Sequence, residues 1–519
     1  MKQRITLCVL LVTMLVPAFA TAGPALSKNE KATVQFFKSI HDSPPMLRGF
    51  LGMMPKGADL HTHLSGAVYA EDYLQWAVED GRCIDTTSFT IVSADGKTGT
   101  DQPQCPAGAI FAAELAKNST LYSAAVNALS TRNMDSATHM WGHDQFFSTF
   151  GRFGAAKQDR DADMLATVVR RAASQGILYV EVMDSIYPDN LKSLAEEVGW
   201  NGDPAAALAA LRSAGLFNGI EQSVAARGET LRRMDELLGP GPGSSTTLRF
   251  IQQVTRTAPP AQVFAQIAYS FELVRQDPNV VAFNLVAPED NPVALRDYSL
   301  QMEMIDALSA LPEYAGTAIT LHAGELSMGL VPPRHLRFHI SEAVEKGHAR
   351  RIGHGVDVMY EENPFALLRT MREKGVAVEI CLSSNDQILH VAGPDHPFPI
   401  YRRYGVPVVL NTDDEGVGRI DLTNEYVRAA LTYNLGYEDV KALSRNSLEY
   451  SFLPGKSLWV GNPAAFEMRS VCQDSLAGQR ETPQCGQLLK ESEKARLQWE
   501  LEKAFTAFER EMAHTVANR

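Results

Sequence analysis

Histidine and aspartate residues close several of the short apolar runs of this chain. They are His61, His63, His322, His354, Asp413 and Asp414. Imidazole and carboxylate groups are ligands that zinc favours, and three or four of them with one open position make a catalytic site. His61 and His63 are two residues apart, so in a strand both side chains point to the same face. We therefore predict a zinc site whose ligands are His61, His63, His322 and Asp413.

The alternative to a metal site is a purely structural role for these residues. A single histidine in a strand usually packs in the core, and an Asp pair often caps a helix. Four strands that each deliver His or Asp at their ends favour a site over coincidence. Other zinc patterns are absent from the sequence: it has no H-E-x-x-H, no H-x-E with P-C-x-x-C, and no C-x-x-C. His335 and His339 are four residues apart, and we interpret them as part of a packed or solvated helix face.

Eight short β-branched or apolar runs alternate with amphipathic stretches. This alternation predicts an α/β fold, and eight repeats predict a (β/α)₈ TIM barrel. Barrel enzymes build their sites at the carboxyl ends of the strands, which is where the histidines and aspartates lie. The runs are residues 58–63, 177–183, 247–254, 280–286, 318–324, 351–355, 376–382 and 406–414.

The gap between the first two runs is too long for one βα unit. We predict a polar insertion at about residues 84–112, and extra helices at both ends of a single barrel domain that spans residues 23–519. Phe spacing around FFSTFGRF (146–153) indicates core packing, with an apolar lid over a ligand as the alternative.

The N-terminus predicts export. Lys2 and Arg4 precede an apolar run, and small residues follow at Ala18, Ala20 and Ala22. This pattern is typical of a cleavable signal peptide over residues 1–22, the alternative being an uncleaved membrane anchor. We therefore expect a secreted or periplasmic protein with no membrane association after cleavage.

Cysteine usage agrees with an oxidising compartment. Two cysteine pairs, Cys83 with Cys105 and Cys472 with Cys485, each bracket a polar stretch and are candidate disulfides. Cys381 lies in an apolar run, and we interpret it as a buried thiol.

Composition narrows the class of partner. The chain has 519 residues, of which 45% are hydrophobic and 21% charged, as in globular proteins. Its formal charge of −13 argues against nucleic acid and fits a small neutral or cationic ligand. The segment 28–50 and the C-terminal helix could mediate a homodimer or pack on the barrel.

Five segments resemble, in order, the signature segments of adenosine deaminases, within the metal-dependent amidohydrolases. They are MPKGADLHTHLSGA (54–67), TLHAGE (320–325), RIGHG (351–355), EICLSSN (379–385) and LNTDDEG (410–416). The export signal, the N-terminal segment and the cysteine-bracketed insertion are similar to the secreted adenosine-deaminase growth-factor branch.

The resemblance implies a role for each matching residue. His61, His63, His322 and Asp413 match the ligands of one zinc ion, which lowers the pKa of a bound water. Glu325 matches the acid that protonates purine N1, and Asp414 matches a contact to the water and to N7. His354 matches the residue that orients or deprotonates the water and stabilises developing charge. The run VVAFNLV has no lysine to bridge two metals, which favours a single ion.

Two substrate-contacting positions depart from the family pattern. Ala287 stands where a glycine usually brings its N–H to purine N3, and Asn284 stands where an Asp is usual. Ser65 occupies a position where some members have a sugar-contacting Asp, and Leu382 replaces a common Pro. Asp414, Ala287 and Ser65 are thus the predicted substrate contacts.

Three functional hypotheses follow. The first is zinc-dependent deamination of adenosine or a close 6-aminopurine nucleoside. The second is hydrolysis of another amine, such as adenine or a modified adenosine. The third is an extracellular nucleoside-binding protein without catalysis. All three expect a small-molecule partner.

Overall fold

The computed structural model describes residues 26–94, 104–134, 139–241, 246–461, 465–473, 475 and 481–517. The predicted signal peptide, residues 1–22, lies outside the described residues. In the part of the chain that is described, no helix is both long and apolar enough to cross a bilayer.

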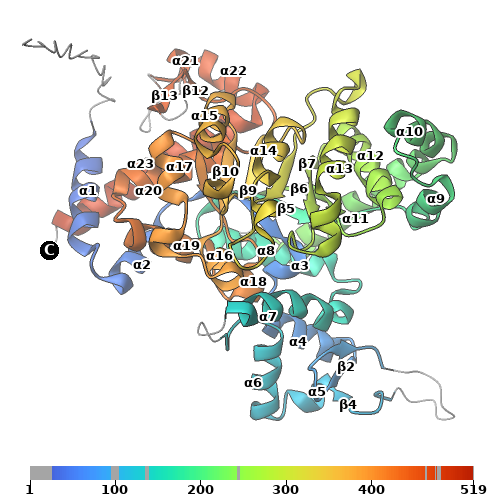
Figure 1. The fold of residues 1–519 in the computed structure, drawn as a ribbon. Helices are drawn as coiled ribbons and strands as arrows, with labels where there is room; N and C mark the ends of the chain where they lie inside the picture. The colour runs from blue at the N-terminus through green and yellow to red at the C-terminus, as the bar shows by residue number, and fades with distance from the viewer. Residues whose placement is uncertain are drawn as a thin grey trace, which may run out of the picture.

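Eight parallel strands lie at the centre of the described structure, where helices surround them (Figure 1). They are β1 (Gly57–His63), β5 (Ile177–Asp184), β6 (Thr247–Thr255), β7 (Val280–Val286), β8 (Thr320–Ala323), β9 (Arg351–His354), β10 (Ala377–Ile380) and β11 (Val408–Leu410). They pair in two sheets, ordered β1-β5-β6-β7 and β11-β10-β9-β8. Parallel bridges join the sheets between Thr62 and Asp413 and between Phe283 and Ile319. The predicted (β/α)₈ barrel is confirmed, and each of the eight predicted runs overlaps one strand.

Helices surround the strands and connect one to the next. They include α8 (Asp161–Ser174), α9 (Leu191–Val198), α10 (Pro204–Ser213), α11 (Ile220–Leu238), α12 (Pro260–Gln276), α13 (Pro292–Ser309), α14 (His339–Glu345), α15 (Pro364–Lys374), α16 (Leu382–Leu389), α17 (Phe398–Tyr404), α19 (Leu422–Tyr433) and α20 (Tyr437–Glu449). The sequence marks the ends of α15: Pro364 fits a first turn, where its missing N–H is not needed, and Gly375 ends the helix with a φ of 66°.

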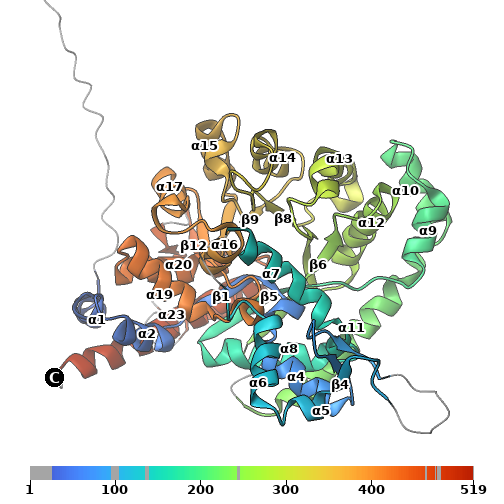
Figure 2. The ribbon, with the colours of Figure 1, turned by 60° about the horizontal axis from the view of Figure 1, so that its bottom comes forward.

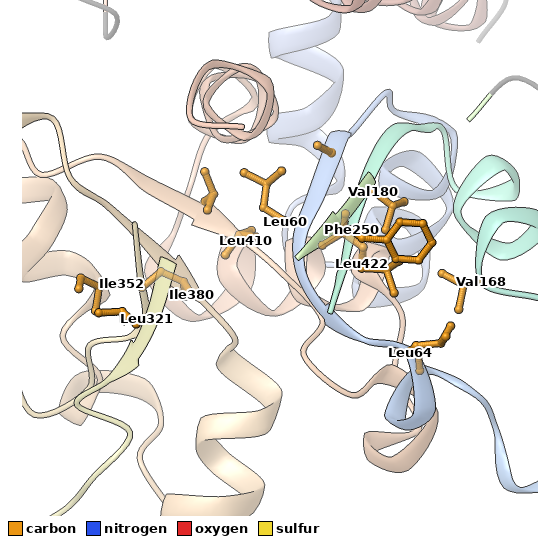
Figure 3. Packing of buried hydrophobic residues seen from close by; sticks show 14 of the residues in the cluster. Leu60, Leu64, Val168, Val180, Phe250, Leu321, Ile352, Ile380, Leu410 and Leu422 are labelled. Carbon is orange, nitrogen blue, oxygen red and sulfur yellow. The ribbon is translucent and has the colours of Figure 1, made fainter. Parts of the chain in front are cut away.

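The apolar core lies between the outer face of the strands and these helices. Figure 3 shows Leu321, Ile352 and Ile380 of three neighbouring strands together on one side of the barrel. Successive strand residues face opposite sides, so the neighbours of these side chains, among them His322 and Glu379, point inward. The barrel interior thus receives the polar residues. A separate small cluster fills part of it: Met183, Ile251, Ala282 and Ala318.

The segment between β1 and β5 forms a lobe of its own (Figures 1 and 2). It contains α3 (Leu64–Ala67), α4 (Ala70–Glu79), β2 (Cys83–Asp85), β3 (Ile91–Val92), β4 (Ala109–Phe111), α5 (Ala112–Leu115), α6 (Ser119–Ala128) and α7 (His139–Arg152). The three strands pair antiparallel in the order β3-β2-β4, and Cys83 is bonded to Cys105. The predicted insertion is therefore a disulfide-pinned sheet rather than only a polar loop.

Helix α7 and the residue that follows it, Phe153, carry the phenylalanines that we predict to pack in the core, with a lid as the alternative. Phe146 and Phe153 are buried, and their rings contact Phe147 and Phe150. A Cβ atom added at Gly142 would lie 2.1 Å from the carbonyl oxygen of Gln387, so α7 crosses α16 at very close range. Since α16 follows β10, the helix lies over the carboxyl ends of the strands (Figure 2). The phenylalanines therefore pack in the hydrophobic core, and the helix that carries most of them covers the carboxyl end of the barrel.

The N-terminal helices pack against the C-terminal helix. They are α1 (Lys28–Ile40), α2 (Pro44–Met53) and α23 (Glu493–Ala517). The Phe50 and Phe508 rings are 5.0 Å apart, and Lys441 of α20 pairs with both Glu30 and Glu509. The two segments proposed as dimer contacts thus pack on each other and on the barrel, while a homodimer stays a prediction.

A short hairpin that the sequence did not predict precedes the C-terminal helices. It pairs β12 (Trp459–Val460) with β13 (Glu467–Met468), and α21 (Ser470–Gln473) and α22 (Pro483–Glu491) follow it. The predicted Cys472–Cys485 disulfide joins these two helices, and Cys381 is a buried free thiol, as expected.

Candidate active site

The four predicted metal ligands meet at the carboxyl ends of the strands. His61 Nε2 lies 3.3 Å and His63 Nε2 lies 3.5 Å from Asp413 Oδ1, and the Nε2 atoms of His63 and His322 are 3.3 Å apart. One ligand atom from each residue falls within 4.8 Å of all the others. Zinc bonds to nitrogen and oxygen are about 2.0–2.2 Å long, which separates tetrahedral ligands by roughly 3.3–3.6 Å. The spacing therefore fits one ion.

The outer nitrogens of two histidines are already hydrogen-bonded. His61 Nδ1 lies 2.5 Å from Glu379 Oε2, and His63 Nδ1 lies 2.7 Å from Gln253 Oε1. Because each Nδ1–H donates to an oxygen, each Nε2 keeps its lone pair for a ligand. His61 Nε2 faces the Asp413 carboxylate, so a cation between the two atoms, either a proton or a metal ion, stabilises this arrangement. The donor set and its orientation fit a zinc ion.

A fully buried ion-pair network supports His61 from inside the barrel. Arg351 Nε donates to Glu379 Oε1 at 2.5 Å, and Arg351 Nη2 donates to Glu181 Oε2 at 2.6 Å. Although burial alone would raise it, Arg351 and His61 lower the pKa of Glu379 to about 2. Burial lowers the pKa of His61, but its hydrogen bonds to Asp413 and Glu379 raise it to about 10, so metal binding must displace a proton.

Glu325 follows β8 and is held through its backbone. Burial, with the Asp413 and Glu289 carboxylates nearby, raises the pKa of Glu325 well above its usual range. This direction favours the protonated form of the side chain, which is the form that a proton donor needs. Glu289 accepts hydrogen bonds from the backbone N–H groups of Gly324 at 3.0 Å and Glu325 at 2.8 Å. His339 Nδ1 donates to the same carboxylate at 2.6 Å.

His354 ends β9 beside Glu325. Its Nε2 lies 3.5 Å from Glu325 Oε1 and 3.9 Å from Asp413 Oδ2, and its Nδ1 lies 3.0 Å from Asn385 Nδ2. Burial lowers the pKa of His354 to about 4, so the ring is neutral at neutral pH. The arrangement places a neutral imidazole between the proposed acid and a metal ligand.

Asp414 points toward α3. A Cβ atom added at Gly66 would lie 1.4 Å from Asp414 Oδ1, so only glycine leaves room for this carboxyl group. Burial and the adjacent Asp413 carboxylate raise the pKa of Asp414 well above its usual range. This direction favours the protonated carboxyl group, which can donate a hydrogen bond, as a contact to a ring nitrogen requires.

The positions that depart from the family pattern at Ser65, Asn284 and Ala287 lie in or just after β1 and β7. Ala287 follows β7 with a φ of 92°, a conformation that glycine adopts readily and alanine only with strain. Ser65 is half-buried in α3, and its carbonyl accepts a hydrogen bond from Tyr73. Asn284 Oδ1 accepts from the backbone N–H of His322 at 3.0 Å, so this residue positions a ligand.

Two more non-glycine residues of the site have a positive φ. Asp413 has a φ of 60° and His354 a φ of 132°. Such backbone strain costs roughly 1–3 kcal/mol for each residue and persists where the surrounding structure enforces it. Two backbone hydrogen bonds enforce this conformation at Asp413. Its N–H donates to the carbonyl of His61, and its carbonyl accepts from the N–H of His63.

A family model described as adenosine deaminase matches residues 126–458. The match covers more than half of the chain and includes His322, Glu325, His354, Asp413 and Asp414. The chain belongs to the adenosine deaminase family. His61, His63 and Ser65 precede the matched range, so their place in the site rests on geometry.

Curated relatives carry the same family name. Adenosine deaminase of Clostridium perfringens is 30% identical over 183 residues, which is 35% of this chain and 51% of that protein. Adenosine deaminase of Enterococcus faecalis is 34% identical over 179 residues, or 34% of this chain and 47% of that protein. The chain thus spans about half the length of the curated relatives it matches.

Solved structures share the fold of this family member. An N6-methyl-AMP deaminase from Arabidopsis thaliana aligns with a TM-score of 0.50 and 16% identity, covering 78% of this chain and 94% of that one. An amidohydrolase from Burkholderia ambifaria with bound Zn aligns with a TM-score of 0.50 and 16% identity, covering 84% and 91%. At this identity the likeness concerns the fold alone.

The structure also shows supporting residues that the sequence did not reveal. They are Arg351, Glu379, Gln253, Glu289, Asn385, His339 and His396. The sequence alone gives little indication of these roles, because residues of the same types are common in strands and loops that carry no site. His335 and His339 do not share a helix: His335 lies in a 3₁₀ turn, and His339 begins α14, where it stacks on Tyr298.

Proposed function

We propose that this chain is a zinc-dependent hydrolase that deaminates adenosine or a close 6-aminopurine nucleoside, giving the 6-oxo purine and ammonia. One observation carries the proposal: four candidate ligand atoms converge beside Glu325, a buried carboxyl group whose raised pKa favours its protonated form. Membership of the adenosine deaminase family supports the reaction class.

The residues divide the work of the reaction. His61, His63, His322 and Asp413 would hold the zinc ion, which lowers the pKa of water when bound. Glu325 gives its proton to ring nitrogen N1 while water adds at C6, and one proton of that water restores the Glu325 carboxyl group. The second water proton passes to the amino group, which leaves as ammonia as the C–N bond breaks and the 6-oxo group forms. Asp414 donates a hydrogen bond to N7. His354 faces the oxygen that adds. Helix α7 covers this end of the barrel and excludes bulk water, which strengthens these electrostatic contacts.

Ammonia release from a panel of substrates tests the proposal. The purified chain with zinc should convert adenosine with a change in ultraviolet absorbance and release of ammonia, and metal analysis of the same sample should give one zinc per chain. No ammonia from adenosine, deoxyadenosine or adenine would contradict the substrate claim.

A Glu325→Gln variant tests the role of the acid. It keeps the size of the side chain but has no proton to give, so turnover should fall by roughly 10²–10⁴-fold with the zinc content unchanged. Glu345→Gln is the matched control, because Glu345 is an exposed residue at the end of α14. Equal turnover in the two variants would refute the role of Glu325.

A second substrate remains a candidate because of Ala287 and Ser65. The strained alanine stands at a predicted base contact and the serine at a predicted sugar contact, so another amine such as adenine or a modified adenosine fits the site too. The ratio of kcat/KM for adenosine to that for adenine decides between the two.

We propose further that the protein is exported. The basic start, the apolar run and the small residues up to Ala22 support a signal peptide, and the two disulfides agree with an oxidising compartment. Expression of the full chain should yield secreted or periplasmic protein with a new N-terminus near residue 23. A full-length N-terminus in the cytoplasm would contradict this.

A further inference from the structure

His354 is the first member of a buried chain of hydrogen bonds that leads away from the metal ligands. Its Nδ1 lies 3.0 Å from Asn385 Nδ2, and Asn385 Oδ1 lies 3.0 Å from His396 Nε2. The backbone N–H of Phe398 donates to His396 Nδ1 at 3.1 Å. His354 and Asn385 have no exposed surface and His396 has 1% exposed, so water does not compete for these bonds.

The backbone N–H of Phe398 fixes the direction of every hydrogen bond in this series. A backbone N–H can only donate, so His396 Nδ1 must be an acceptor without a proton. A neutral His396 then carries its proton on Nε2 and donates to Asn385, which must present its oxygen there. The amide nitrogen of Asn385 is thereby turned toward His354, and because it can only donate, His354 Nδ1 must accept.

A neutral His354 with a bare Nδ1 has its proton on Nε2. That Nε2 is buried and has no hydrogen-bond partner among the described residues, and the atoms that face it are Glu325 Oε1 and Asp413 Oδ2. The chain of bonds therefore aims one N–H group at the space between the proposed acid and a metal ligand. Burial lowers the pKa of His396 to about 3, which agrees with a neutral ring there.

We infer that Asn385 and His396 are positioning residues that hold His354 as a hydrogen-bond donor, so that it donates to the oxygen adding to the purine ring and takes no proton from it. The inference rests on the proposed function for the identity of that oxygen. To accept a proton on Nε2, His354 would need its own proton on Nδ1, facing the amide N–H. Asn385 would then have to turn, and His396 would lose its bond to Phe398.

Neutron diffraction from crystals of the deuterated, zinc-loaded full chain tests the inference without any substrate. We expect deuterium on Nε2 and none on Nδ1 in both His354 and His396, with Asn385 Nδ2 facing His354. Deuterium on His354 Nδ1, or the opposite orientation of the Asn385 amide, would overturn the inference. Because no turnover is measured, this result stands even if adenosine is not the substrate.

The Asn385→Asp variant distinguishes two roles of His354, hydrogen-bond donor and base, because the two roles predict opposite changes in kcat. A carboxylate accepts from Nδ1–H and leaves Nε2 bare, which suits a base and disables a donor. We expect kcat to fall by about 10–100-fold with a KM change within about threefold and one zinc per chain, the range that loss of a supporting partner typically gives. A kcat at or above that of the unmodified chain would overturn the inference.

Variants of His396 separate positioning from packing. His396→Gln keeps an N–H donor for Asn385, whereas His396→Leu has a similar size and no donor. We expect His396→Leu to lose most of kcat and His396→Gln to retain a large part of it, with both variants folded by circular dichroism. Equal kcat values in the two variants would show that His396 only fills space.

Discussion

Two histidines of the site are supported in opposite ways. His61 Nδ1 faces the Glu379 carboxylate, which is paired with Arg351, whereas His354 Nδ1 faces the neutral amide of Asn385, which His396 orients. We call the first set the charged support and the second the neutral support. Both are buried, and both start from a strand end at the same rim.

The difference between the supports matches the difference between the two tasks. A carboxylate behind a histidine fixes Nδ1–H and raises the basicity of Nε2, which suits a metal ligand. An amide N–H behind a histidine does the reverse: it occupies Nδ1 and leaves a proton on Nε2. The atom behind each ring thus decides whether its front face accepts or donates.

Breaking the charged support at its cation should have the largest effect on stability. Arg351→Met removes the buried cation that pairs with both Glu181 and Glu379 inside the barrel, and removal of one partner of a buried pair costs about 3–5 kcal/mol. Urea unfolding at neutral pH measures this loss. Arg350→Met is the matched control, since the neighbouring Arg350 is exposed and its removal should cost less than about 1 kcal/mol. Equal losses in the two variants would contradict a special role for the network.

A milder change to the charged support should act on the metal. Glu379→Gln replaces the carboxylate that orients His61, and such changes weaken metal binding by about 10–100-fold, or roughly 1.4–2.8 kcal/mol. Competition with a zinc chelator measures the affinity. Glu373→Gln, an exposed change on α15, is the control. If zinc affinity is the same in both variants, Glu379 does not tune the ligand.

The convergence of the four candidate ligands could be predicted from sequence, because strand ends in a parallel barrel lie together. His61, His63, His322 and Asp413 each close an apolar run, so the fold places them together without further information. The roles of Glu325 and His354 could be predicted only from the family resemblance, since a Glu or His at a strand end has many structural uses.

Neither support could be predicted, for a physical reason. Glu379 is 318 residues from its partner His61, and His396 touches Asn385 only because α16 turns back before α17. These contacts depend on side-chain direction across strands and on a short loop, which periodicity does not fix. The hairpin of β12 and β13 was missed because two-residue strands carry almost no pattern.

The two supports should respond to acid in different pH windows. His396 has a folded pKa of about 3 and an unfolded pKa of about 6.5, lowered by burial and by the nearby Arg428 and His354. Below pH 6.5 the unfolded state binds a proton that the folded state does not, so stability falls as the pH falls. The depressed pKa of Glu379 stabilises the folded state above pH 4.5, and this stability is lost only as the pH falls below that value.

A measurement between pH 7 and pH 5 therefore isolates the neutral support. The free energy of unfolding of the unmodified chain should drop by about 2 kcal/mol more than that of His396→Gln, which lacks the titrating group. Urea unfolding at the two pH values gives the difference. If both proteins lose the same stability, His396 does not stay neutral in the fold.

The smallest effect is expected for a change at Ala287, which belongs to neither support. Ala287 has a φ of 92°, and its replacement by glycine relieves strain but adds freedom to the unfolded chain, for a net gain of about 1 kcal/mol in stability. Zinc affinity and the tautomer of His354 should be unchanged, because Ala287 contacts neither support, whereas the KM for nucleosides should change at this predicted base contact. A change in zinc affinity with a constant KM would mean that the β7 end acts on the metal rather than on the substrate.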